Sequence, residues 1–214
     1  ALETIFVGTP WIVVASLLIL LTHLSAGPRM AIYTTAFLCY MGLLGFWEKA
    51  MTTLALLGTA ACLSIIIGIP LGMFCARRQR TYAVIQPIMD FMQTMPAFVF
   101  MIPVIAFFGT GKPAAVVTTM IFGGTPVVRL TVLGLRGVPE SVREAAASFG
   151  ASKWYLLTKV DLPLAAPSIR AGVNQTIMLS LAMVVVASLI GAKGLGEDVL
   201  EALQYANVGQ GILA

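Results

Sequence analysis

The chain has 214 residues, of which 59% are hydrophobic and only 10% carry a formal charge. Soluble domains usually carry about 25% charged residues, so this composition excludes an ordinary soluble domain and indicates a membrane protein. The net charge of +4 is no sign of nucleic-acid binding here, because in a membrane chain the placement of Lys and Arg matters more than their sum.

Several apolar runs are long enough to cross a bilayer, which takes about 20 residues of helix. The runs are apolar on all sides and do not alternate, so they predict helices rather than barrel strands. We count six spans and the start of a seventh, at residues 5–24, 30–47, 50–76, 91–111, 113–128 (with an extension to 135), 171–192 and 202–214. Because the last run is short, we expect the chain to continue past Ala214.

The basic residues predict the orientation, since Lys and Arg accumulate in cytoplasmic loops. Arg77, Arg78 and Arg80 follow the third span and place that loop in the cytoplasm. With alternating spans, ten of the thirteen basic residues then lie inside, and the amino terminus lies outside. The polar segment 137–163 is therefore predicted to be cytoplasmic.

The first half of this segment predicts a short helix. Pro139 suits a first helical turn, and Val142, Ala145, Ala146 and Phe149 recur at spacings that form one apolar face. The face allows two interpretations that the residues alone leave open. It is either a docking surface for another protein or an amphipathic loop lying on lipid headgroups.

The second half predicts a turn and another helix. Gly150 suits a left-handed helix stop, and Ser152 suits the cap of a helix over residues 153–160. The pair Leu162-Pro163 is expected to end that helix.

The order of residues in this segment resembles the EAA loop of ABC-importer permeases. The sequence Glu144-Ala145-Ala146 is followed by Gly150, and nine further residues lead to Val160-Asp161-Leu162-Pro163, where the family pattern has Ile in place of Val. The resemblance implies that the loop docks on a cytoplasmic ATPase subunit. The residues assigned to this coupling are Glu144, Ala145, Ala146, Gly150, Val160, Leu162 and Pro163.

Longer stretches, including "MQTMPAFVF" from Met92 and "GVNQTIMLSLAMVV" from Gly172, resemble the glycine betaine/proline betaine permeases, from about Trp47 to the end. The resemblance implies an all-α, polytopic transmembrane bundle of the type I (MetI-like) permease kind. It divides the chain into two accessory helices (1–47) and a permease core (48–214) with a truncated last helix and the coupling loop 137–163.

The implied function is import of quaternary-amine compatible solutes such as glycine betaine, choline, carnitine or trimethylamine-oxide-like molecules. The implied partners are an ATP-binding subunit, a periplasmic or lipid-anchored substrate-binding protein, a second copy of the chain and the lipid of the inner membrane, with no nucleic acid. ATP and magnesium would bind the ATPase, because this sequence lacks the G-x-x-x-x-G-K-[ST] motif. We therefore expect no enzyme activity, resident cofactor or metal in this chain.

Four polar residues near the spans are candidates for the transport path: Asp90, Gln93, Asn174 and Gln175. A carboxylate is costly inside a bilayer, so Asp90 either serves the path or lies at a helix end near the basic residues that follow the third span. Asn174 and Gln175 either line the path or form hydrogen bonds between helices.

The acidic stretch after Lys193 is predicted to lie outside. Glu197, Asp198 and Glu201 there suit a short helix that touches a partner, or an ordinary solvated loop.

Two other classes of function remain open. A permease of the same architecture can carry another small polar solute, such as an amino acid. An ion-coupled secondary transporter would need acidic residues deep in its spans, and Asp90 is the single candidate.

Overall fold

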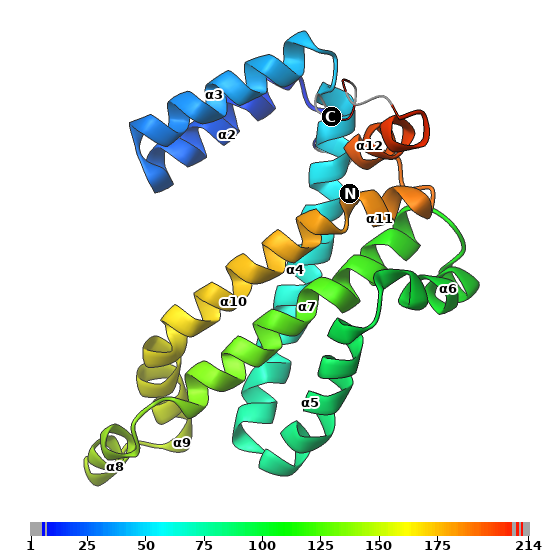
Figure 1. Cartoon of the computed structure of the whole chain (residues 1–214). Helices are drawn as coiled ribbons and strands as arrows, with labels where there is room; N and C mark the ends of the chain where they lie inside the picture. Colours follow the sequence, from blue (N-terminus) through cyan, green and yellow to red (C-terminus); the bar gives the residue numbers. More distant parts are fainter. Residues whose placement is uncertain (1–5, 7, 207–208, 210, 212–214) are drawn as a thin grey trace. The chain divides into compact units, whose positions relative to one another are not determined.

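The computed structural model describes residue 6, residues 8–206 and residues 209 and 211. All regular secondary structure in this part of the chain is helical (Figure 1). The elements are α2 (Trp11–Ala26), α3 (Pro28–Leu43), α4 (Trp47–Arg77), α5 (Gln79–Thr94), α6 (Ala97–Phe108), α7 (Lys112–Arg136), α8 (Glu140–Ser148), α9 (Lys153–Tyr155), the π-helix η1 (Leu156–Asp161), α10 (Leu162–Ala182), α11 (Val184–Leu189) and α12 (Leu195–Gln204).

The chain forms two compact units. The first unit comprises Ala1–Thr59, Val104–Val116 and Met183–Ala214, and the second comprises Ala60–Pro103 and Val117–Ala182. The predicted division into accessory helices (1–47) and a core (48–214) stays a prediction.

Two of the described helices, α4 and α7, are long and apolar enough to cross a membrane by themselves. Helices α5 and α6 meet the same requirement only as a pair, and they bend by 104° at the break between them. The chain is therefore a multi-pass membrane protein. The prediction of six full spans is not matched, because several apolar runs are divided by helix ends that hydrophobicity does not reveal.

The predicted span 91–111 was wrong as a single helix. Helix α5 ends at Thr94, and Met95 has an extended backbone (φ −80°, ψ 141°). The ring of Pro96 disfavours helical geometry in the residue before it, so α6 begins in a new direction at Ala97.

The predicted span 171–192 was also wrong in its bounds. Leu162-Pro163 does not end a helix, because η1 continues directly into α10, which then ends at Ala182. Pro163 is tolerated for two reasons. It lies in the first turn of α10, and the wider π-turn before it shifts the backbone carbonyl with which a proline ring would otherwise clash.

The two amino-terminal runs form α2 and α3, each of 16 residues. Gly27 alone separates them, with φ +86°, a conformation that favours glycine. Pro10 precedes α2 and Pro28 opens α3, which fits proline at a helix start. The first predicted span begins at residue 5 and the last predicted span ends at residue 214. Both of these positions lie outside the described residues.

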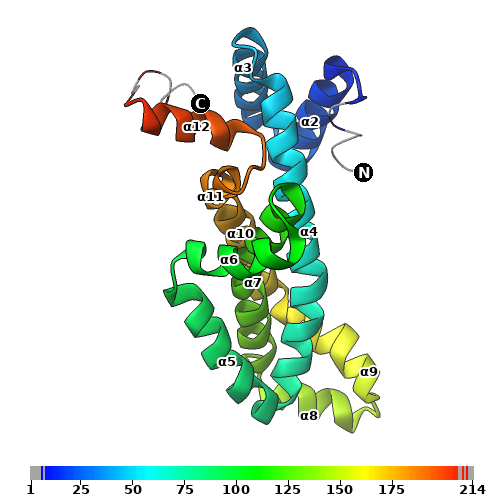
Figure 2. The same ribbon diagram turned by 90° about the vertical axis from the view of Figure 1, so that its right-hand side faces the viewer.

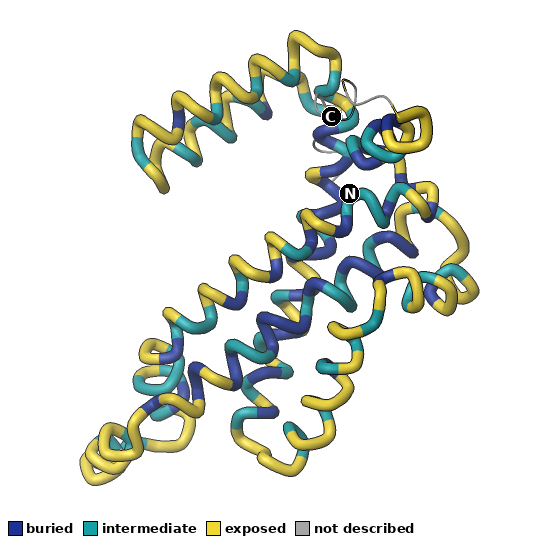
Figure 3. Tube along the Cα trace, in the orientation of Figure 1, coloured by how far each residue is buried: buried dark blue, intermediate teal, exposed yellow. Residues whose placement is uncertain are grey.

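Helix α7 is the central element of the second unit and packs closely against both α4 and α10 (Figures 1 and 2). A Cβ atom built on Gly72 of α4 would lie 2.6 Å from the Cβ of Thr131 on α7. One built on Gly172 of α10 would lie 3.1 Å from the Cα of Val127 on α7. Much of α7 is buried in Figure 3. Val127 and Thr131 are each 0% exposed.

Replacing Gly72 by Ala is expected to destabilise the protein, because the added methyl group would overlap Thr131. Overpacking of this kind costs about 1–3 kcal/mol, and each kcal/mol lowers the thermal midpoint of a chain this size by roughly 2–4 °C. The matched control is Gly58→Ala in the same helix, where nothing lies within 4 Å of the new Cβ. Equal thermal midpoints for the two variants in detergent would contradict close packing at Gly72.

Candidate functional site

Helix α8 carries the first half of the EAA-like motif and ends in a glycine turn. Gly150 has φ +79°. Its N–H donates to the carbonyl oxygen of Ala147 at 2.9 Å, and the N–H of Ala151 donates to that of Ala146 at 3.2 Å. This pair of bonds is a Schellman turn, so the predicted left-handed stop at Gly150 is confirmed.

The predicted cap at Ser152 is also confirmed, because its Oγ accepts a hydrogen bond from the N–H of Tyr155 at 3.2 Å. The helix that follows differs from the prediction for residues 153–160. It changes from α9 to the π-helix η1 at Leu156, and the N–H of Leu162 donates to the carbonyl oxygen of Leu157.

The turn between α8 and α9 is mainly exposed (Figure 3), and its exposed residues include large apolar ones. Phe149 is 93% exposed and Trp154 is 73% exposed. A hollow of about 530 Å³ lies at this turn, lined by Ala146, Phe149, Gly150, Ala151, Ser152 and Tyr155. Exposed apolar groups are typical of surfaces that bind a protein or a membrane, so both predicted interpretations of this segment stay open.

Arg143 fixes the base of α8, a role that the sequence did not reveal. Its Nε donates to Asp161 Oδ1 at 2.7 Å, and its Nη2 donates to the carbonyl oxygen of Leu135, near the end of α7, at 2.6 Å. The side chains of Arg143 and Asp161 are 32% and 13% exposed. We call this contact between α8, η1 and α7 the arginine brace. The 18-residue separation of the two partners gives no helical spacing from which to predict it.

The predicted coupling residues lie on both sides of the brace. Glu144 and Ala145 are exposed on α8, directly after Arg143. Val160 and Leu162 flank Asp161 and are half-buried, while Pro163 is exposed. The brace thus holds together the two halves of the motif, whose role in coupling stays a prediction.

The four predicted path residues do not form one site within the described structure. Asp90 on α5 forms an ion pair with Arg129 on α7. The sequence did not reveal this partner, and the role of Asp90 in the path stays a prediction. Gln93 is exposed near the end of α5, and Asn174 and Gln175 are exposed on α10.

An apolar cavity of about 320 Å³ lies between α4, α5 and α7 of the second unit. Its lining includes Met89 and Met92 of α5 and Met120 of α7, with Ser64 and Thr125 as its hydroxyl groups. Flexible methionine side chains adapt to varied shapes, but no charged side chain lines this space.

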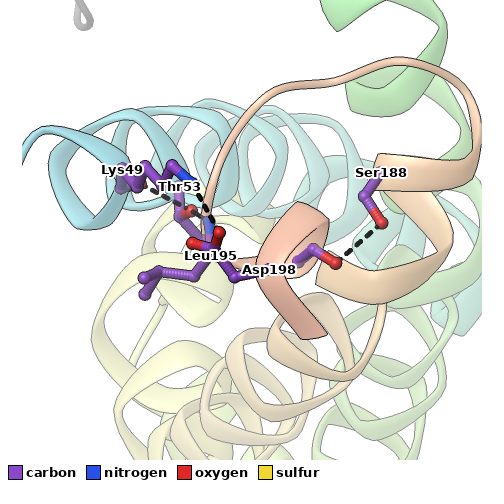
Figure 4. A network of polar contacts seen from close by, with 6 residues as sticks. Lys49, Thr53, Ser188, Leu195 and Asp198 are labelled. Carbon is purple, nitrogen blue, oxygen red and sulfur yellow. Dashed lines mark hydrogen bonds and ion pairs between the residues drawn. The ribbon is translucent and has the colours of Figure 1, made fainter. Parts of the chain in front are cut away.

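The first unit holds a second polar cluster, drawn in Figure 4. Lys49 Nζ donates to Asp198 Oδ1 at 2.5 Å, and the N–H of Leu195 donates to Thr53 Oγ1 at 2.9 Å. Both contacts fasten the start of α12 to the first turns of α4. Ser188 Oγ also donates to the carbonyl oxygen of Gly196 at 3.0 Å.

The short helix predicted for Glu197, Asp198 and Glu201 is confirmed as α12, and its contact with a partner stays a prediction. The alternative of a solvated loop is wrong for Asp198. Its side chain is only 6% exposed and faces Lys49. Glu197 and Glu201, on the same helix, are exposed as expected.

The fold, the exposed turn and the braced helix define a class of membrane transport subunit. Residues 68–214 match the family described as binding-protein-dependent transport system inner membrane component, and the chain belongs to this family. The family predicted from the EAA-like spacing is confirmed.

Named relatives share much of the sequence. The chain is 44% identical over 207 residues to the "Glycine betaine/proline betaine transport system permease protein ProW" of Escherichia coli (strain K12), covering 97% of this chain and 58% of the relative. It is 42% identical to the "Glycine betaine transport system permease protein OpuAB" of Bacillus subtilis (strain 168), covering 86% and 66%. It is 39% identical to the "Trimethylamine N-oxide transport system permease protein TmoV" of Pelagibacter ubique (strain HTCC1062), covering 94% and 28%. The chain thus spans less than two thirds of the length of these relatives.

Solved structures share the fold. Chains from two inward-facing crystal forms of the MetNI methionine ABC transporter superpose with TM-scores of 0.63 and 0.66, at 22% and 21% identity. The matches cover 74% and 76% of this chain, and 78% and 81% of those chains. The predicted MetI-like fold is confirmed.

Replacing Arg143 by Met is expected to loosen α8, because it leaves the mostly buried Asp161 carboxylate without its cation. Removing one partner of a charged hydrogen bond costs about 1–3 kcal/mol, which corresponds to a roughly 5- to 150-fold larger equilibrium constant for local opening. Hydrogen exchange of the α8 and η1 amides measures this change. The variants Asp161→Asn and Arg143→Met/Asp161→Asn complete a cycle that should be non-additive. Arg170→Met, an exposed change on α10, is the control, and additive effects in the cycle would contradict the brace.

Replacing Lys49 by Met is expected to destabilise the attachment of α12, because Asp198 would stay buried without a cation. Lys49 is 44% exposed, so water reduces the cost to about 1–3 kcal/mol. The double variant Lys49→Met/Asp198→Leu should be less harmful, since it leaves no unpaired charge. Limited proteolysis of α12 is the measurement and Glu197→Gln is the control. If Lys49→Met behaves like Glu197→Gln, the ion pair does not hold α12.

Proposed function

We propose that the chain is the permease subunit of an ATP-driven importer of quaternary-amine compatible solutes, in the bacterial inner membrane. The observation that carries this proposal is the EAA-like motif presented on an exposed and braced helical turn, in a chain of this transport family.

The cargo class rests on the relatives. Their names specify glycine betaine, proline betaine and trimethylamine N-oxide, and a relative from Listeria monocytogenes is named for glycine betaine and carnitine. These molecules share a small, methylated, cationic or dipolar nitrogen group. Choline belongs to the same chemical class. The likeness to the methionine transporter is one of fold and carries no argument for an amino acid as cargo.

The turn between α8 and α9 is the surface we assign to the ATPase subunit. Phe149 and Trp154 project from it, and aromatic side chains are favoured at the centres of protein interfaces. Glu144, Ala145, Ala146 and Gly150 form the small, accessible part of the turn, which lets a partner approach the backbone closely.

The brace gives a route from that surface to the membrane helices. A push on α8 acts through Arg143 on Leu135 at the end of α7 and on Asp161 at the end of η1. Because η1 continues into α10, the brace connects α8 both to α7, which is long and apolar enough to span a membrane, and to α10. ATP-driven closure of the ATPase would thereby change the path between its outward and inward forms.

The assembly we propose contains two copies of this chain, two ATPase subunits that bind ATP and magnesium, and a substrate-binding protein on the outer side, either periplasmic or anchored to lipid. Asp90, Gln93, Asn174 and Gln175 remain candidates for the path. The opposite charges of Asp90 and Arg129 at the α5–α7 contact favour a positioning role for that pair.

The test is uptake of radiolabelled glycine betaine and choline by vesicles that contain the full-length permease, its ATPase and its binding protein. We expect accumulation that requires ATP. Accumulation of an amino acid in place of either amine would support the alternative cargo. Uptake driven by an ion gradient without ATP would contradict the importer class.

The coupling surface is tested separately with Glu144→Lys and Gly150→Pro. Both should abolish substrate-stimulated ATP hydrolysis while membrane insertion stays normal, and Arg170→Gln, an exposed change on α10 outside the assigned surface, should leave hydrolysis unchanged. Normal stimulation in both motif variants would sink the docking assignment even if the cargo is correct.

A further inference from the structure

A cavity of about 270 Å³ lies beside the base of α8 in the second unit. Three arginines line it from three different helices: Arg77 at the end of α4, Arg136 at the end of α7, and Arg143 on α8. Asp161 and Leu157 of η1 also line the cavity. At about 30 Å³ per water molecule in the liquid, the space is large enough for a tetrahedral anion.

Two of the arginines are already held in place. Arg143 is fixed by Asp161 and by the carbonyl oxygen of Leu135. Arg136 lies over the ring of Tyr82, 4.6 Å from its centroid, and donates through Nη2 to the carbonyl oxygen of Cys75 at 3.3 Å. Side chains that are ordered before binding lose little entropy when a ligand arrives.

The donors around the cavity outnumber the acceptors. Each guanidinium carries five N–H donors, but the described residues supply only the oxygens of Asp161, Leu135 and Cys75 as acceptors for this group. Arg77 has no acceptor within the described part of the chain. A ligand with several acceptor oxygens would satisfy the remaining donors.

The charges are also unequal. Three guanidinium groups face a single carboxylate. Arg77 and Arg136 lie at the carboxyl ends of α4 and α7, where each helix contributes roughly half a negative charge. These two partial charges together offset about one of the two excess positive charges, so the cavity retains an attraction for anions.

We propose that this cavity binds a phosphate group. Its three or four oxygens match arginine donors that converge from three directions, and arginine binds phosphate through paired hydrogen bonds. The group belongs either to an anionic phospholipid or to a free phosphate. The lipid source fits the position, because α4 and α7 are the two described helices long and apolar enough to span the membrane unaided, and both end at the cavity. Basic pockets between membrane helices on the cytoplasmic side bind anionic headgroups.

Native mass spectrometry of the delipidated full-length complex tests the proposal. Phosphatidylglycerol, phosphatidylcholine and inorganic phosphate are each titrated. We expect phosphatidylglycerol to be retained in preference to phosphatidylcholine. Arg77→Gln should weaken this binding about three- to tenfold, since it removes one exposed charged partner. Arg77 is exposed and forms no side-chain hydrogen bond or ion pair among the described residues, so the variant should assemble normally.

Arg170→Gln is the matched control, because it makes the same charge change at an exposed position of α10. If Arg77→Gln binds phosphatidylglycerol more weakly than Arg170→Gln does, the cavity is a lipid site. If only the binding of inorganic phosphate is weakened in this way, the cavity is a free-phosphate site. Equal retention of phosphatidylglycerol and phosphatidylcholine with no phosphate bound, or equal losses in Arg77→Gln and Arg170→Gln, would overturn the proposal.

Discussion

The second unit depends on the close approach of α7 to α4 and α10. Lipid tails are as apolar as leucine, so hydrophobicity alone does not drive helices together in a membrane, and tight packing across small residues must do so. Gly72 and Gly172 provide that packing on either side of α7. Two polar contacts of this unit depend on where α7 is held: the ion pair of Asp90 with Arg129, and the hydrogen bond of Arg143 to Leu135.

The arginine brace extends this arrangement into the polar part of the chain. Arg143 reaches the carbonyl oxygen of Leu135, one of the last residues of α7. Carbonyl groups at a helix end lack intrahelical partners, so the brace satisfies a group that would otherwise need water. A short helix of nine residues is marginal alone. Its attachment to α7 and η1 therefore gives α8 a defined position.

The sequence predicted the features that depend on local geometry. Gly150 and Ser152 were identifiable because a left-handed stop and a helix cap each need a particular residue type. The contacts of Arg143 with Asp161 and of Asp90 with Arg129 were not predictable, because each joins helices whose relative rotation is unknown from one sequence. Hydropathy likewise detected the run 171–192 but not the break within it. The residues on both sides of the break are apolar, although α10 ends at Ala182 and α11 begins at Val184.

The exposed aromatic turn has a consequence for how the protein is made. Phe149 and Trp154 are mostly uncovered in the isolated chain, and burying a large apolar side chain yields roughly 1.5–3 kcal/mol. A copy of the chain without a bound partner therefore has an exposed apolar surface, the kind of feature that chaperones and proteases recognise. If this turn binds the ATPase as proposed, synthesis in excess of that subunit would leave copies with an uncovered apolar surface, prone to aggregation or removal.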